Sequence, residues 1–87
     1  MDINIKGYCT DARMTFFVTV QAGFKVKERL KQIGFRWNQK DVQWDACFSY
    51  EITDATNKPE WDTLDFVPRL EEATGRYRDR WSVEILG

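Results

Sequence analysis

The sequence predicts a small α+β domain in which an antiparallel sheet of about five strands carries two helices packed on one face. Several segments alternate apolar and polar residues with a period of two, which is the pattern of a half-buried strand. Two other segments have helical spacing of apolar residues or helix-start signals, and each ends at a glycine. The elements follow one another in the order ββαββαβ, which is typical of an antiparallel sheet covered on one side.

The first twenty residues are expected to fold as a β-hairpin. Apolar and polar residues alternate along both arms, and a polar turn at residues 10–13 separates the arms. Phe17 interrupts the polar side of the second arm. Its ring is therefore either exposed for a partner or covered by another part of the structure.

A short helix that stops at a glycine is expected next, within residues 24–34. Val26, Leu30 and Ile33 are spaced so that they form one apolar side of a helix. Gly34 is placed to close this helix in a left-handed turn, after which Phe35 can fold back onto Leu30.

The clearest strand signal covers residues 42–50. One side of this strand is apolar and consists of Val42, Trp44, Ala46, Phe48 and Tyr50. A shorter strand at residues 35–37 precedes it, and the polar residues 38–41 form the turn between the two strands.

A loop and a second helix are expected in the next part of the chain. The helix should cover roughly residues 66–74, because Pro68 is tolerated only in a first turn. Thr63 or Asp65 can cap its start, and Gly75 can end it.

The last segment alternates again and is expected to be a strand. Three arginines at alternate positions would then form a row on one side, about 6.6 Å apart. Such a row suits phosphates or carboxylates of a partner. Alternatively, it protects an edge strand from aggregation, or nearby carboxylates neutralise it internally. The candidate residues for contact with a protein partner are Arg76, Arg78, Arg80, Glu71, Glu72 and Trp61.

Length and charge indicate one domain, residues 1–87, with two differently charged parts. The formal net charge is −1. Residues 1–50 contain eight Lys/Arg and five Asp/Glu, whereas residues 51–87 contain five and nine. A molecule with such an asymmetry can dock on charged partners of either sign, although both parts can also be ordinary solvated surfaces.

Several classes of function are disfavoured by residues that the chain lacks. It has no histidine, which excludes His-dependent catalytic triads and His-ligated metals, and it contains no phosphate-binding glycine motif. We therefore expect no enzyme, no metal and no cofactor. Cys9 and Cys47 are the only cysteines, and neither an apolar leader nor an apolar span occurs. A cytoplasmic protein with reduced thiols and no membrane contact is expected, with one disulfide as the alternative.

A basic helix surface is the second candidate for binding. Its residues are Lys25, Lys27, Arg29, Lys31, Arg36, Trp37 and Lys40. The cations can contact phosphates, and the indole ring can stack on an unpaired base. As an alternative, lysine and arginine are common on any solvated helix, and Trp37 can pack against Trp44 across the hairpin.

An acidic set offers a third candidate surface. It consists of Glu51, Asp54, Glu60, Asp62, Asp65, Glu71 and Glu72. Such carboxylates can imitate nucleic-acid phosphates in the binding channel of another protein, or they can be ordinary helix-start and surface residues.

Residues 24–48 resemble a small module of plasmid and phage DNA-processing proteins. In that family a helix ending in Leu-Gly-Ala-Arg-Trp-Asp leads into a hairpin closed by Lys-x-Trp. The matching positions are Lys27, Leu30, Lys31, Gly34, Phe35, Arg36, Trp37 and Trp44. Asn38 stands where the family usually has aspartate, and Gln43 where lysine is common. The resemblance implies a setting in mobile-element or phage DNA metabolism; it implies no activity.

We therefore expect a small, non-enzymatic, phage-like binding protein. Its expected role is to inhibit or modulate a host nucleic-acid-handling complex, such as a CRISPR-type defence nuclease, by occupying a surface on that protein or nucleoprotein complex. The alternatives are a module that binds single-stranded nucleic acid through the basic helix surface, and a structural domain of a phage assembly.

Overall fold

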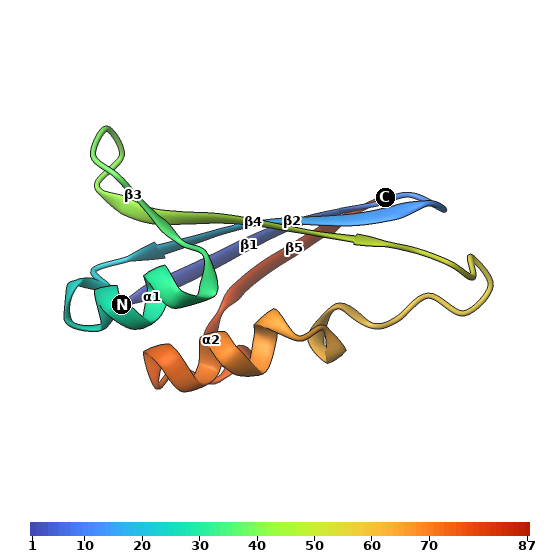
Figure 1. The fold of residues 1–87 in the computed structure, drawn as a ribbon. Helices are drawn as coiled ribbons and strands as arrows, with labels where there is room; N and C mark the ends of the chain where they lie inside the picture. The colour runs from blue at the N-terminus through green and yellow to red at the C-terminus, as the bar shows by residue number, and fades with distance from the viewer.

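The computed structural model describes all residues from Met1 to Gly87 as a five-stranded sheet with two α-helices on one of its faces (Figure 1). The strands are β1 (Asp2–Cys9), β2 (Arg13–Gln21), β3 (Arg36–Asn38), β4 (Gln43–Glu51) and β5 (Ser82–Leu86). The helices are α1 (Lys27–Ile33) and α2 (Phe66–Thr74), and the short 3-10 helices are η1 (Phe24–Val26), η2 (Trp61–Thr63) and η3 (Arg78–Arg80). The predicted α+β fold class and the order ββαββαβ are confirmed.

The strands lie in the order β3-β4-β2-β1-β5, and one pairing differs from the expectation. The β1–β2, β2–β4 and β3–β4 pairs are antiparallel, but β5 runs parallel to β1. The prediction of a wholly antiparallel sheet was therefore wrong for β5. The chain returns through α2 to the end of the sheet at which β1 starts, and such a crossover connection produces a parallel pair.

The hydrophobic core lies between the sheet and the helices, and aromatic rings hold α2 in place. Phe66 of α2 stacks on Phe48 of β4, with ring centroids 4.6 Å apart and an interplanar angle of 8°. It also lies 5.5 Å from the ring of Phe16, which is fully buried. Burial of such rings removes large apolar areas from water, so this cluster is a main source of the stability of a small domain.

Helix α1 ends as the sequence predicts. Gly34 has φ 121°, and its N–H donates to the carbonyl oxygens of Leu30 and Lys31. The N–H of Phe35 donates to the carbonyl oxygen of Leu30, which completes a Schellman-type cap. Both Leu30 and Phe35 are buried, so the same turn that stops the helix also adds to the core.

Helix α2 has the predicted bounds, but its start is not capped by a side chain. Gly75 ends the helix with φ 69°. The carboxylate of Asp65 instead accepts a hydrogen bond from the hydroxyl of Tyr50, at 2.7 Å. Burial and this hydrogen bond raise the pKa of Tyr50. Asp65 thus links the helix start to β4. Neither helix has the length and apolar character needed to cross a membrane.

The β3–β4 hairpin departs from the expected pattern at one residue. β4 begins at Gln43, and Val42 belongs to the preceding turn, with φ 54° and 65% of its surface exposed. The expectation that Val42 continues the apolar side of the strand was wrong. Asn38 organises this turn, because its side chain bonds to both the backbone N–H and the carboxylate of Asp41.

We expect Gly7→Ala to lower the free energy of unfolding by about 1–3 kcal/mol. A Cβ atom at this position of β1 would lie 2.6 Å from Cδ1 of Ile85 and 2.8 Å from Cε1 of Phe16. The end of Ile85 can move aside, but the buried Phe16 ring is held by the core. Urea denaturation measures this loss. In a protein that also carries Ile85→Ala, Gly7→Ala should cost nearly the same free energy of unfolding, because the contact with Phe16 remains. An unchanged stability of Gly7→Ala would show that the packing around Phe16 is looser than described.

Candidate functional site

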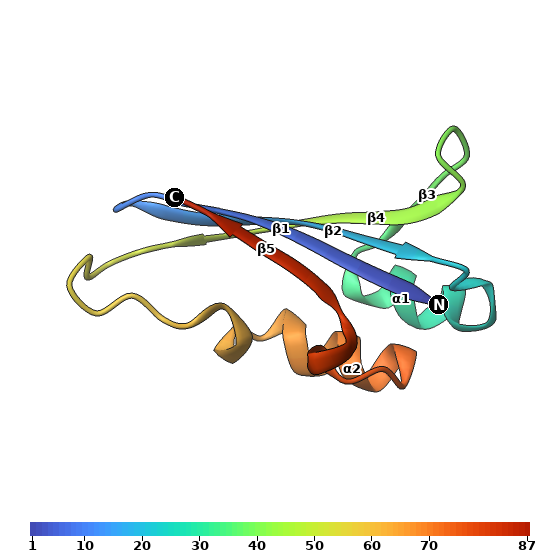
Figure 2. The same cartoon turned by 180° about the vertical axis from the view of Figure 1, so that it is seen from behind.

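The face of the sheet opposite the helices is not covered by any other part of the chain (Figures 1 and 2). We call it the open sheet face. Its side chains come from all five strands: Asp2, Asn4, Lys6 and Tyr8 of β1, Arg13, Thr15, Phe17, Thr19 and Gln21 of β2, Arg36 and Asn38 of β3, Gln43, Asp45, Cys47, Ser49 and Glu51 of β4, and Ser82, Glu84 and Leu86 of β5. The tip of the β3–β4 hairpin projects on the same side (Figure 1).

Exposed apolar side chains cluster on the open sheet face, from Phe17 of β2 across Tyr8 of β1 to Leu86 of the edge strand β5. Phe17 is 50% exposed, Tyr8 43% and Leu86 40%. The rings of Tyr8 and Phe17 meet edge to face, with centroids 5.7 Å apart, and Cys47 stands beside Phe17 on β4. The sequence left open whether Phe17 is exposed or covered; within this chain it is exposed. Large apolar side chains at the centre of an otherwise polar face are typical of a protein-binding surface.

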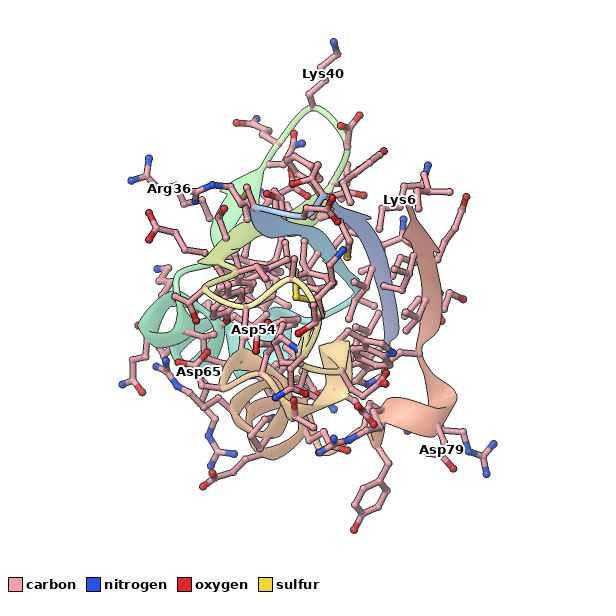
Figure 3. The ribbon with its side chains drawn as sticks, turned by 90° about the vertical axis from the view of Figure 1, so that its right-hand side faces the viewer. Lys6, Arg36, Lys40, Asp54, Asp65 and Asp79 are labelled. Atoms are coloured by element: carbon pink, nitrogen blue, oxygen red, sulfur yellow. The ribbon has the colours of Figure 1, made fainter.

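The charges on the open sheet face nearly balance. It carries three cationic side chains and four carboxylates, namely Lys6, Arg13 and Arg36 against Asp2, Asp45, Glu51 and Glu84. Arg13 and Glu51 form an exposed ion pair of 3.5 Å, and Lys6 extends away from the sheet (Figure 3). A surface that binds nucleic acid needs an excess of positive charge, and this face has none.

A shallow groove of about 490 Å³ lies at the base of the hairpin, where the open sheet face reaches the edge of β4. Phe17, Gly34, Arg36, Asp45 and Cys47 are among its lining residues. The groove therefore combines apolar surface with one guanidinium and one carboxylate at its rim. Sequence patterns alone could not indicate it, because its residues come from β2, β4 and the segment that enters β3.

The residues of the basic helix surface are only partly brought together. Lys31 pairs with Glu28 at 3.6 Å, and the ammonium of Lys27 lies 4.6 Å from the centroid of the Phe24 ring. Trp37 is 46% exposed on the helix side of the sheet and packs edge to face on Trp44, at 5.3 Å. The expected cross-hairpin contact between these indoles is thus present.

The other members of that set stand elsewhere. Lys25 and Arg29 are exposed around α1, and no carboxylate lies within ion-pair distance of either. Arg36 and Lys40 belong to the opposite side of the sheet, with Lys40 at the hairpin tip (Figure 3). The seven residues therefore do not form one continuous surface.

The expected row of arginines on a strand was wrong. Residues 78–80 form η3 and β5 starts only at Ser82, so Arg76, Arg78 and Arg80 do not alternate along a strand. The reason is a tertiary contact that local alternation does not reveal. The guanidinium of Arg78 binds the Glu71 carboxylate through Nη2 at 2.5 Å and Nε at 3.2 Å, and its Nη1 reaches the carbonyl oxygen of Asp62.

The other four members of the expected partner-binding set are not brought together on one surface. Trp61 is partly buried and packs against Trp81, with ring centroids 6.4 Å apart. Glu72 is exposed and borders a separate groove between α1 and α2, beside Arg29 and Arg69. Arg76 and Arg80 are exposed. Contact of these exposed residues with a partner stays a prediction, whereas Arg78 and Glu71 already bind each other.

Most of the acidic set is also engaged within the protein. Hydrogen bonds from Thr56 lower the pKa of Asp54, which shapes the loop after β4. Asp65 binds Tyr50, as described above, and Asp54 lies in the loop after β4, so neither carboxylate belongs to the open sheet face. These contacts favour structural roles for the carboxylates over the imitation of phosphates.

The structure offers no obvious metal or disulfide site. No group of three or more Cys, Asp or Glu is placed so that it could hold a metal ion. Cys9 and Cys47 are free, and they differ in exposure: Cys9 packs partly against the core, whereas Cys47 is exposed on the open sheet face.

Comparisons of this chain with protein-family models, with curated proteins and with solved structures gave no match. The chemistry and geometry of its surfaces are therefore the basis for inferring a function.

We expect Glu71→Gln to destabilise the protein at neutral pH but not at acid pH. Hydrogen bonds from Arg78 lower the pKa of Glu71 below its ordinary value of 4.5, so the ionised carboxylate stabilises the fold above that pH. This contribution is lost as the pH falls through the lowered folded-state pKa, because the carboxyl is then protonated in both states.

Urea unfolding at about pH 7 and about pH 2 measures this difference. Glu72→Gln is the matched control, since the neighbouring Glu72 is exposed and forms no ion pair. An equal loss of stability for Glu71→Gln at both pH values would contradict a stabilising ion pair with Arg78.

Proposed function

We propose that this chain is a non-enzymatic binding protein that docks on another protein through the open sheet face. By occupying a surface, it inhibits or modulates a nucleic-acid-handling complex such as a CRISPR-type nuclease. The observation that carries the proposal is the exposed pair of rings, Phe17 and Tyr8, at the centre of a face that the helices leave bare.

The composition of the face supports a protein as the partner. Binding energy at protein interfaces is concentrated in a few central apolar or aromatic residues that a polar rim shields from water. Phe17 and Tyr8 provide such a centre, Leu86 extends the apolar surface to the edge strand β5, and the neighbouring side chains are threonine, serine and Lys6. Nearly balanced charges on the rim suit a protein surface and give no general attraction to phosphates.

The choice of a nucleic-acid-handling complex depends on the resemblance of residues 24–48 to phage and plasmid DNA-processing proteins. That segment forms α1, β3 and the start of β4, so it borders the open sheet face at the hairpin. Inhibition by occupying a surface requires only affinity and placement. This mechanism is compatible with a chain in which no histidine and no ready nucleophile–base pair are present.

We expect Phe17→Ser to weaken inhibition about tenfold or more, because it removes the central anchor of the face. The measurement is cleavage of target DNA by a panel of purified CRISPR-type nucleases at increasing concentrations of the protein. Tyr77→Ser is the matched control, since Tyr77 is equally aromatic but lies before η3, away from the open sheet face.

Full inhibition by Phe17→Ser would rule out the open sheet face as the docking surface. If the wild type inhibited no nuclease in the panel, the proposed class of target would be wrong.

A second candidate function is binding of single-stranded nucleic acid by the helix side of the hairpin. The specific observation is the half-exposed ring of Trp37, which packs on Trp44. The ammonium of Lys31 lies 6.0 Å from the centroid of the same Trp44 ring, so a cation stands close to Trp37. Lys25 and Arg29 lie on the adjacent helix surface and have no carboxylate partner. A ring beside unpaired cations can stack a base while the cations contact the backbone.

For this candidate we expect quenching of tryptophan fluorescence by single-stranded DNA at low salt, and a steep loss of affinity as salt increases. Trp37→Ala should weaken binding by about 1–3 kcal/mol if its ring stacks on a base. Trp61→Phe is a suitable control, because Trp61 packs against Trp81 instead. Absence of binding at tens of micromolar protein would remove this candidate.

A further inference from the structure

Most of the outer edge of β4 has no neighbouring strand. β3 is the last strand of the sheet on this side, and it pairs with β4 only from Gln43 to Asp45. Residues 46–51 of β4 therefore pair with β2 on one side only. No side chain or loop hydrogen-bonds to the backbone of residues 46–50. In such an edge every second residue presents an unpaired N–H and C=O to the solvent.

This edge lacks the features that normally prevent strand addition. Residues 46–50 are Ala-Cys-Phe-Ser-Tyr, with no charge and no proline. Native edge strands usually carry lysine, proline, a bulge or an inward-pointing charge, because an unprotected edge is a template for another strand. The opposite edge of the sheet, β5, has Glu84 at its middle. The β4 edge is thus the less protected of the two.

The groove at the base of the hairpin lies where this edge begins. An extended segment added beside residues 46–51 would continue the line of β3 and direct alternate side chains over Phe17 and Cys47. Gly34, which precedes β3, lines the same groove, and nothing lies within 4 Å of the position that a Cβ atom would take there. A groove of about 490 Å³ has room for a large apolar side chain.

Arg36 supplies a charge that is not used within the protein. It stands directly opposite Asp45 in the β3–β4 register, yet the two form no ion pair. The oxygens of Asp45 instead accept hydrogen bonds from the side-chain amides of Asn38, at 2.7 Å, and Gln43, at 2.8 Å. Arg36 lines the groove, and its side chain extends outward from the sheet (Figure 3). A partner carboxylate is the group that complements it.

We propose that the β4 edge is the site at which the partner protein adds an extended segment, with a large apolar side chain in the groove and a carboxylate on Arg36. This inference rests on the proposed function, since it specifies how the partner of the open sheet face is held. Backbone hydrogen bonds to the edge supply affinity, and the groove with Arg36 supplies selectivity.

A second copy of this chain is a poorer occupant of the site. The β4 edge of another copy would direct Cys47, Ser49 and Glu51 to this side of the sheet, and Glu51 already pairs with Arg13 of its own copy at 3.5 Å. The side chains of Cys47 and Ser49 are too small to fill a groove of about 490 Å³. The occupant is therefore a segment of a different protein that alternates a large apolar residue with an aspartate or glutamate.

The test uses a displayed library of random dodecapeptides, selected on the full-length wild-type protein. The proposal predicts that enriched peptides carry an acidic residue two positions from a large apolar residue. Arg36→Glu should lower their affinity about tenfold or more. Lys40→Glu is the matched control, because Lys40 is a cation of the same hairpin but lies at its tip, outside the groove.

Amide hydrogen exchange of the full-length protein then locates the bound peptide. Protection of alternate amides in residues 46–51 supports strand addition. Four results would each overturn the proposal. The selection could enrich no peptides, or only peptides without an acidic residue. The enriched peptides could bind without protecting these amides, or the wild type could self-associate through the same edge. None of these results decides whether a partner docks on the open sheet face, which the inhibition assay with Phe17→Ser tests. The proposed function and the proposed edge site can therefore fail separately.

Discussion

The structure depends on one constraint, which is that two short helices bury only one side of a five-stranded sheet. Helix α2 is held there by the stack of Phe66 on Phe48, and α1 is closed onto the core through Leu30 and Phe35. All the buried apolar residues of the strands point to these helices. The other side must stay in water or meet a partner, and exposed rings at its centre are energetically unfavourable in water. The core and the candidate binding surface therefore result from the same arrangement.

Features of the fold that depend on neighbouring residues could be predicted from the sequence. The alternation in β4 and the glycines that end α1 and α2 are local signals, and all were confirmed. The features that were missed depend on distant residues. β5 is parallel because of where α2 returns the chain, and Asp65 binds Tyr50 of β4 instead of capping its own helix.

The candidate site was predicted less completely, for the same reason. Phe17 could be recognised as a break in an alternating pattern, but no local signal shows that the helices leave its side of the sheet bare. Arg78 was expected on a binding surface because its contact with Glu71 forms only when η3 folds against α2. Conversely, Arg36 was expected on the basic helix surface, yet the β3–β4 register places it on the opposite side, beside the groove.

The most direct test of the central claim is the rate at which the thiol of Cys47 is alkylated in cells that produce the protein. Cys47 lies beside Phe17 on the open sheet face, whereas Cys9 packs against the core and serves as an internal reference. If a partner covers the open sheet face, Cys47 should react much more slowly in cells than in the purified protein, relative to Cys9. Equal relative rates in both conditions would contradict the claim that this face is occupied when the protein acts.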